Sequence, residues 1–241
     1  MDINNLVIEN KSKFEKWEKI LTTHFDKLMN FDKYSQDERF TIFDDTNELL
    51  IDFANIFYKY GRFKDEWDDS KCSQIVYGQN IYLKSMKTNH TFDWGVYEDN
   101  FVLRSYISYP ENFKYMSDDF WTSLMELIQY GDFSFVENSG LNKEDKKYFN
   151  SNKSNLFRLL RNYFLHDIKN INLSEINRDF EMDLGWLEVK WSFDTKWEDL
   201  IINASKTFKI MYKLNYKLWK IDNFKTKENN KKNVNQRYKP F

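Results

Sequence analysis

Hydrophobic positions along the chain follow two spacings, one typical of helices and one typical of strands. A repeat of three or four residues predicts helices over residues 13–31, 41–60, 117–131, 155–168 and 196–221. Alternation rich in β-branched and aromatic residues predicts strands over 73–109 and 171–193. The expected fold is therefore mainly α within the α+β class. It is a helical bundle with a small antiparallel sheet near residues 73–109 and a β-hairpin near 171–193.

The same pattern divides the chain into three regions. Residues 1–115 form a helical N-terminal region with the small sheet, and residues 116–221 form a helical domain with the hairpin. Residues 222–241 are polar and rich in lysine, which predicts a disordered tail with weak electrostatic affinity for RNA. The acidic residues 65–69 and the stretch 132–142 are expected to be loops.

Composition supports helices joined by short connections. Of 241 residues, 19% are aromatic, whereas only 6 are Gly and 2 are Pro, which argues against a sandwich or barrel with many tight turns. The formal net charge of −2 provides no global positive field, so RNA binding requires a local patch. Cys72 is the only cysteine, which excludes an internal disulfide and a cysteine-based zinc site. No signal peptide or membrane span is expected, so we predict a cytoplasmic protein.

The segment 155–168 is the strongest candidate for chemistry. Its apolar stripe consists of Leu156, Leu159, Leu160, Tyr163 and Phe164. At about 100° per residue, the opposite arc carries Arg158, Arg161, Asn162 and His166. Helix surfaces usually mix acidic and basic residues, but this arc contains no acid. The arrangement indicates a helix with one face in the core and one face that concentrates cations and a histidine.

These side chains match the requirements for cleaving RNA without a metal ion or other cofactor. A guanidinium binds phosphate oxygens and stabilises the charge of the transition state, as Arg161 would. Histidine transfers protons near neutral pH, which suits His166. Asn162 lies four residues before His166 and would orient the imidazole or a phosphate. Arg158 and Lys169 would bind backbone phosphates of the RNA.

The sequence Arg161-Asn162-x-x-x-His166 also resembles the R-x4-6-H motif of HEPN domains, in which a polar residue often follows the arginine. The resemblance implies an all-helical, usually dimeric domain and a metal-independent endoribonuclease of toxin–antitoxin, abortive-infection or CRISPR systems. It further implies that Arg161 and His166 are catalytic, that Asn162 supports them, and that a homodimer brings two motifs together. Expected partners are RNA and a protein antitoxin or a phage or host protein. Ile168 stands where some toxins of the family have tyrosine.

Two other functions remain open. Glu188 and Lys190 form a Glu-x-Lys on a predicted strand, with Asp179 on the strand before it, which is similar to the metal-dependent PD-(D/E)XK nucleases. Asn177-Arg178 stands where that family has a Pro-Asp. The other alternative is a non-enzymatic helical interaction module, such as a phage-encoded inhibitor or an antitoxin-like partner. In that case the aromatic residues would serve the core and an interface.

The remaining candidate residues have no assigned chemistry. His24 falls within an apolar stripe and is expected to be packed rather than to bind a ligand. His90 is expected in a loop without a catalytic role. The sequence does not decide whether Asp93, Glu98 and Asp99 form a site.

Overall fold

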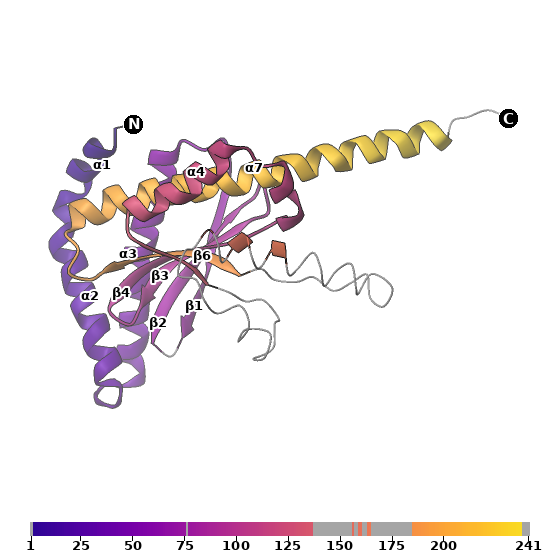
Figure 1. Cartoon of the computed structure of the whole chain (residues 1–241). Coiled ribbons are helices and arrows are strands. Elements are labelled where there is room, and N and C mark those ends of the chain that lie inside the picture. Colours follow the sequence, from indigo (N-terminus) through magenta and orange to yellow (C-terminus); the bar gives the residue numbers. More distant parts are fainter. Residues whose placement is uncertain are drawn as a thin grey trace.

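The computed structural model describes residues 2–75, 77–136 and 185–237, together with Leu156, Leu159, Leu160, Tyr163 and Phe164. These residues form one antiparallel sheet of six strands with helices on one of its faces (Figure 1). The strands are β1 (Trp67–Ile75), β2 (Gly78–Ser85), β3 (Thr91–Tyr97), β4 (Asn100–Tyr106), β5 (Asp132–Val136) and β6 (Trp186–Ser192). Their order across the sheet is β1-β2-β3-β4-β6-β5.

The helices precede the sheet, follow its first four strands, and close the chain. They are α1 (Ile3–Asn10), α2 (Phe14–Met29), α3 (Gln36–Gly61), α4 (Asp118–Glu126) and α7 (Trp197–Arg237). Short 3-10 turns are η1 (Lys11–Lys13), η2 (Phe31–Lys33), η3 (Pro110–Tyr115) and η4 (Leu127–Gln129). A capping box between Ser35 and Glu38 satisfies backbone donors at the start of α3. Among the described residues, no helix has the length and apolar content required to cross a membrane.

The core lies between the sheet and the helices α3 and α7. Because side chains alternate along a strand, every second residue of β2, β3, β4 and β6 points toward these helices. Trp94 of β3 contacts Phe53 of α3 with ring centroids 5.5 Å apart, and Phe57 stacks on Phe208 of α7 at 5.1 Å. All four rings are fully buried. Such aromatic pairs add to the free energy gained from burying their area, so the layer of rings holds α3 and α7 on the sheet.

The predicted α+β class is confirmed, but the described residues do not form the expected helical bundle. The apolar stripes of α3 and α7 pack on a sheet as well as on each other. The sheet is also larger than predicted, since it has six strands rather than a small set near residues 73–109. It draws β1–β4 from the predicted N-terminal region, and β5 and β6 from the predicted helical domain that follows it.

Of the hairpin expected over residues 171–193, the first strand lies outside the described residues, and the pairing predicted for the second strand is wrong. The predicted second strand exists as β6, with Leu187, Val189 and Trp191 facing the core. However, β6 pairs with β4 along one edge and with β5 along the other. Both edges are therefore occupied by strands distant in sequence. Alternation predicts that a segment is a strand, but it carries no information about which strand lies beside it.

Four further segments differ from the prediction. β1 begins at Trp67, within the acidic stretch expected to be a loop, and β5 occupies the start of the second expected loop. β5 is only five residues long, so its alternation of Phe133 and Phe135 with polar neighbours is a weak signal. α1 was not predicted. At the other end, α7 continues to Arg237 where we expected a disordered tail (Figure 1). The sequence 222–237 contains no glycine or proline to end the helix.

Candidate functional site

The face of the sheet opposite the helices, here called the polar face, carries a row of side chains that crosses all six strands. The strand register aligns them directly, one residue from each strand. In sheet order they are Lys71, Tyr82, Asp93, Arg104, Glu188 and Ser134. Neighbours in such a row have Cβ atoms about 5 Å apart, so their charges interact directly.

Arg104 and Glu188 form the centre of this row. The Arg104 Nε donates to Glu188 Oε2 at 2.5 Å, and Lys190 Nζ lies 3.2 Å from Glu188 Oε1. The Arg104 guanidinium also lies over the rings of Tyr97 and Trp186, at 5.7 and 5.9 Å from their centroids. Glu188 is only 3% exposed. Both of its carboxylate oxygens are therefore engaged by cations in a largely water-free position, where leaving a charge unpaired is costly.

Asp93 lies beside Arg104 on the side opposite Glu188, and its carboxylate has fewer hydrogen-bond partners than that of Glu188. The Asp93 side chain is buried, and its Oδ1 atom has no hydrogen-bond partner among the described residues. Burial raises the pKa of Asp93 from its ordinary value near 3.8 to about 6, although the charge of Arg104 acts in the opposite direction. The charge on Asp93 is thus a cost to the folded protein at neutral pH, since the Arg104 Nε is bound to Glu188.

Replacing Asp93 with asparagine is expected to stabilise the protein at high pH. The folded-state pKa of Asp93 exceeds its unfolded value, so the folded state binds more protons between pH 3.8 and 6 and stability falls as the pH rises through this window. The Asp93→Asn variant lacks this loss, which is at most about 3 kcal/mol above pH 6. Urea unfolding at pH 4, 6 and 8 measures the difference. A difference that stays constant with pH would contradict the assignment.

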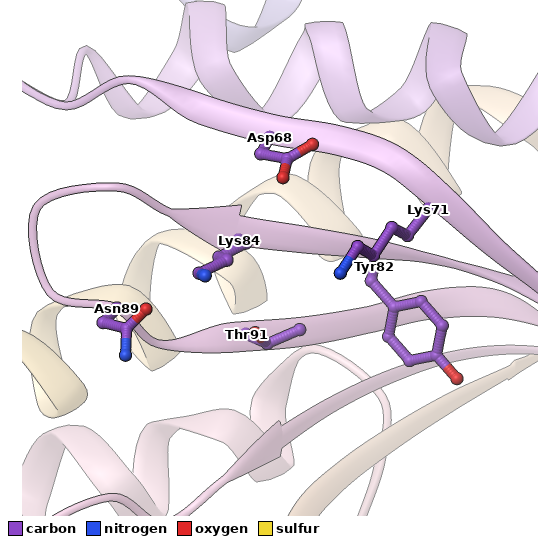
Figure 2. A pocket seen from close by; sticks show the side chains of 6 residues that line it. All are labelled: Asp68, Lys71, Tyr82, Lys84, Asn89 and Thr91. Carbon is purple, nitrogen blue, oxygen red and sulfur yellow. The ribbon is translucent and has the colours of Figure 1, made fainter.

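A hollow of about 430 Å³ lies on the polar face at the β1 end of the row. It is lined by Asp68, Lys71, Tyr82, Lys84, Asn89 and Thr91. Figure 2 shows Asp68 and Lys71 coming from β1, Tyr82 and Lys84 from β2, and Asn89 from the turn that leads to Thr91 at the start of β3. Of the described lining residues, two lysines only donate hydrogen bonds, Tyr82, Asn89 and Thr91 can donate or accept them, and Asp68 only accepts.

The residues of the predicted ribonuclease motif lie outside the described residues. These are Arg158, Arg161, Asn162, His166 and Lys169, and the same holds for Asp179 of the metal alternative. Of the predicted apolar stripe, Leu159 and Tyr163 are helical and buried, Leu156 and Leu160 are partly buried, and Phe164 is 60% exposed. The stripe is therefore confirmed at four positions, but at Phe164 it is wrong.

The metal alternative gains no support from Glu188 and Lys190. The sheet neighbours of Glu188 are Arg104 on β4 and Ser134 on β5, and neither can serve as the second carboxylate. A cation at Glu188 would have to displace two positive side chains. Within the described ranges, no three histidine, cysteine, aspartate or glutamate side chains are placed to share a metal ion, and this includes Asp93, Glu98 and Asp99.

The two described histidines are both buried, which confirms the packed position predicted for His24, and His90 lies in a loop as predicted. His24 is 1% exposed and its Nδ1 lies 3.1 Å from Thr46 Oγ1. His90 is also buried and lies within hydrogen-bond distance of the Ser105 and Ser108 hydroxyls. Burial lowers the pKa of each imidazole to about 3, and the charge of nearby Lys27 contributes at His24. Both rings are therefore neutral at physiological pH and unsuited to proton transfer.

Sequence reasoning missed the polar row and the hollow. The available signal was a polar residue at every second position of the predicted strands, which marks one face but not the partners across it.

Comparison with known proteins gave no match among protein-family models, curated proteins or solved structures. A function for this chain therefore has to be inferred from its residues and their geometry.

Proposed function

We propose that the protein is a metal-independent ribonuclease of the HEPN type that acts as a homodimer. His166 transfers the proton, Arg161 stabilises the charge on the phosphate, and Asn162 orients one of them. Arg158 and Lys169 bind backbone phosphates. A role in phage defence or a toxin–antitoxin pair follows from the family resemblance of this motif.

The observation that supports this proposal is the anchoring of the motif segment by its apolar side. Leu159 is 1% exposed, and together with Leu187 of β6 and Leu214 of α7 it lines a small internal cavity. The Tyr163 ring meets the Phe113 ring of η3 at a centroid distance of 5.7 Å. A helix fixed to the core in this way can present its other side in a defined orientation, which a catalytic group requires.

The exposure of Phe164 refines which residues are expected on the open side. Helical neighbours three positions apart share a side, so Arg161 is expected on the same side as exposed Phe164. By the same spacing, His166 follows the buried Tyr163 by three positions and is expected at the edge of the apolar side. A histidine at such an edge is partly shielded from water yet accessible to a phosphate, as proton transfer requires.

The proposed reaction is an internal displacement at phosphorus. The 2′-oxygen of a ribose loses its proton to a base and attacks the adjacent phosphorus, while the bond to the 5′-oxygen breaks and that oxygen takes up a proton. The products are a 2′,3′-cyclic phosphate and a 5′-hydroxyl. His166 supplies one of the two proton transfers, and the copy in the dimer partner supplies the other. Arg161 binds the phosphate oxygens as their negative charge increases.

The test is incubation of the purified full chain with labelled single-stranded RNA in excess EDTA. Cleavage at a rate within about twofold of that in Mg²⁺ is expected, because neither proton transfer nor the arginine needs a metal ion. Cleavage that appears only when Mg²⁺ is added would overturn the proposal. The Arg161→Lys variant is a useful companion, since lysine retains the charge but loses the planar pair of donors.

A protein-binding function is the second candidate, and exposed apolar side chains favour it. Met29 at the end of α2, Phe31 in η2 and Phe40 in α3 are 69%, 46% and 58% exposed and lie close together in the chain. Contiguous exposed apolar surface marks interaction sites, and these three side chains are the candidates for one, with the Arg39 guanidinium 3.7 Å from the centre of the Phe31 ring. Absence of RNA cleavage under both conditions, with loss of a protein complex in the Met29→Ser, Phe40→Ser double variant, would favour this function.

A further inference from the structure

The hollow beside β1 is shaped by an irregularity in that strand. β1 advances by three residues from Asp68 to Lys71 while β2 advances by two from Lys84 to Tyr82. In a regular strand, residues three apart point to opposite faces, but the bulge turns both Asp68 and Lys71 to the polar face. Bulges of this kind often lie next to functional sites, where they redirect a side chain.

The two lysines of the hollow form no ion pair with a described carboxylate. Across the described ranges, ion pairs join Lys13 to Asp52, Lys16 to Glu48, and both Arg104 and Lys190 to Glu188, but none involves Lys71 or Lys84. Asp68, the acid among the described lining residues, accepts hydrogen bonds from the Ser70 hydroxyl at 2.6 Å and the Ser70 backbone N–H at 3.2 Å. These bonds lower the pKa of Asp68, and the two lysine charges add to the effect.

Neutral donors complete the lining. Thr91 contributes a hydroxyl and Asn89 a carboxamide, whereas the Tyr82 ring forms a wall and its hydroxyl points away from Lys84 and Asn89 (Figure 2). Asn89 adopts a left-handed backbone conformation with φ of 56°, which sets the turn that brings its side chain to the hollow (Figure 2). Two ammonium groups and two neutral donors around one concave space match the acceptor oxygens of a phosphate.

We infer that this hollow binds a backbone phosphate of RNA. The inference rests on the proposed function, because it takes RNA as the substrate and adds a binding surface remote in sequence from the cleavage motif. A volume of about 430 Å³ falls in the range of sites that hold small organic ligands, so it accommodates a phosphate with its ribose. The charge of the whole chain is −2, so affinity for RNA must come from local cationic sites such as this one.

The test is RNA binding by a Lys71→Gln, Lys84→Gln double variant, measured with a labelled single-stranded RNA. All proteins carry His166→Ala so that the RNA stays intact, which separates this result from the success or failure of cleavage. The double variant is expected to bind about tenfold more weakly near physiological salt. The slope of log affinity against log salt concentration is expected to be shallower by about 0.7, corresponding to the loss of one neutralised phosphate of a single strand.

The matched control is a Lys19→Gln, Lys33→Gln double variant, which removes the same charge from exposed positions on α2 and η2. It should bind RNA like the parent, and a Lys71→Arg, Lys84→Arg variant should retain binding. Equal loss in the control, no loss in the hollow variant, or no binding by the parent would each overturn the inference. If AMP or inorganic phosphate displaced the RNA and bound with an affinity equal to that of the RNA, the inference would also be overturned, since the ligand would then be a free phosphate.

Discussion

The His166→Ala variant is expected to lose RNA cleavage by at least about 100-fold while keeping the fold of the parent. General acid–base catalysis by a positioned side chain contributes roughly 10²–10⁴ in rate, so removing the imidazole removes that factor. Stability should change little, because the expected position of His166 is at the edge of the apolar side rather than in the core. The measurement is the single-turnover rate constant for cleavage of labelled RNA in EDTA, with thermal unfolding of the same preparations.

The control for this variant is Lys19→Ala, an exposed residue of α2 distant in sequence from the motif. It should cleave at the parental rate. Parental activity in His166→Ala would remove the histidine from the mechanism. Loss of activity together with a large drop in melting temperature would show that His166 is a packing residue.

Acidification is expected to destabilise the protein strongly between pH 6.5 and 3. His24 and His90 have folded-state pKa values of about 3, below the unfolded value near 6.5, so the unfolded state binds more protons in this window. Their contribution to stability is complete above pH 6.5 and is lost as the pH falls. At pH 4.5 the two histidines together lower the free energy of unfolding by up to about 5 kcal/mol. Asp93 acts in the opposite direction, because its protonation at pH 4.5 raises the free energy of unfolding by about 2 kcal/mol.

Urea unfolding at pH 7.5 and 4.5 tests this expectation. The free energy of unfolding should fall by about 3 kcal/mol, a large fraction of the roughly 5–15 kcal/mol typical of a domain. His24→Gln and His90→Gln should each show a smaller change with pH, even if either is less stable at pH 7.5. Imidazole NMR signals of the native protein provide a second check. Titration of either ring near pH 6 would contradict its burial as a neutral group.

The sequence allows the pairing of strands that are adjacent in the chain to be predicted, but not the pairing of strands that are distant in the chain. The alternation over 73–109 predicts β2 and β4 and leaves β3 open as a turn or a strand; the three are joined by short turns and pair with their sequence neighbours. β6 was recognised as a strand, but its partner β4 lies about eighty residues earlier, and only the folded chain shows this pairing. Alternation gives the face that each side chain occupies and leaves the partner strand undetermined.

For the polar face, too, part of the arrangement was predictable from the sequence and part was not. Asp93, Arg104 and Glu188 each occupy a polar position of a predicted strand, so their common face was predictable in principle. Their juxtaposition was not, because it depends on the register of three strands from two distant regions of the chain. Lys71 required in addition the bulge in β1, which reverses the side expected from its distance to Asp68.

Chemical identification of the RNA ends formed in EDTA tests the central claim most directly. Mass spectrometry of the products from a short RNA distinguishes the two classes of cleavage, because internal displacement retains the phosphate on the upstream fragment. The account predicts a 2′,3′-cyclic phosphate and a 5′-hydroxyl from the parental protein, and intact RNA from His166→Ala. A 3′-hydroxyl with a 5′-phosphate, or RNA left intact by the parental protein, would contradict it.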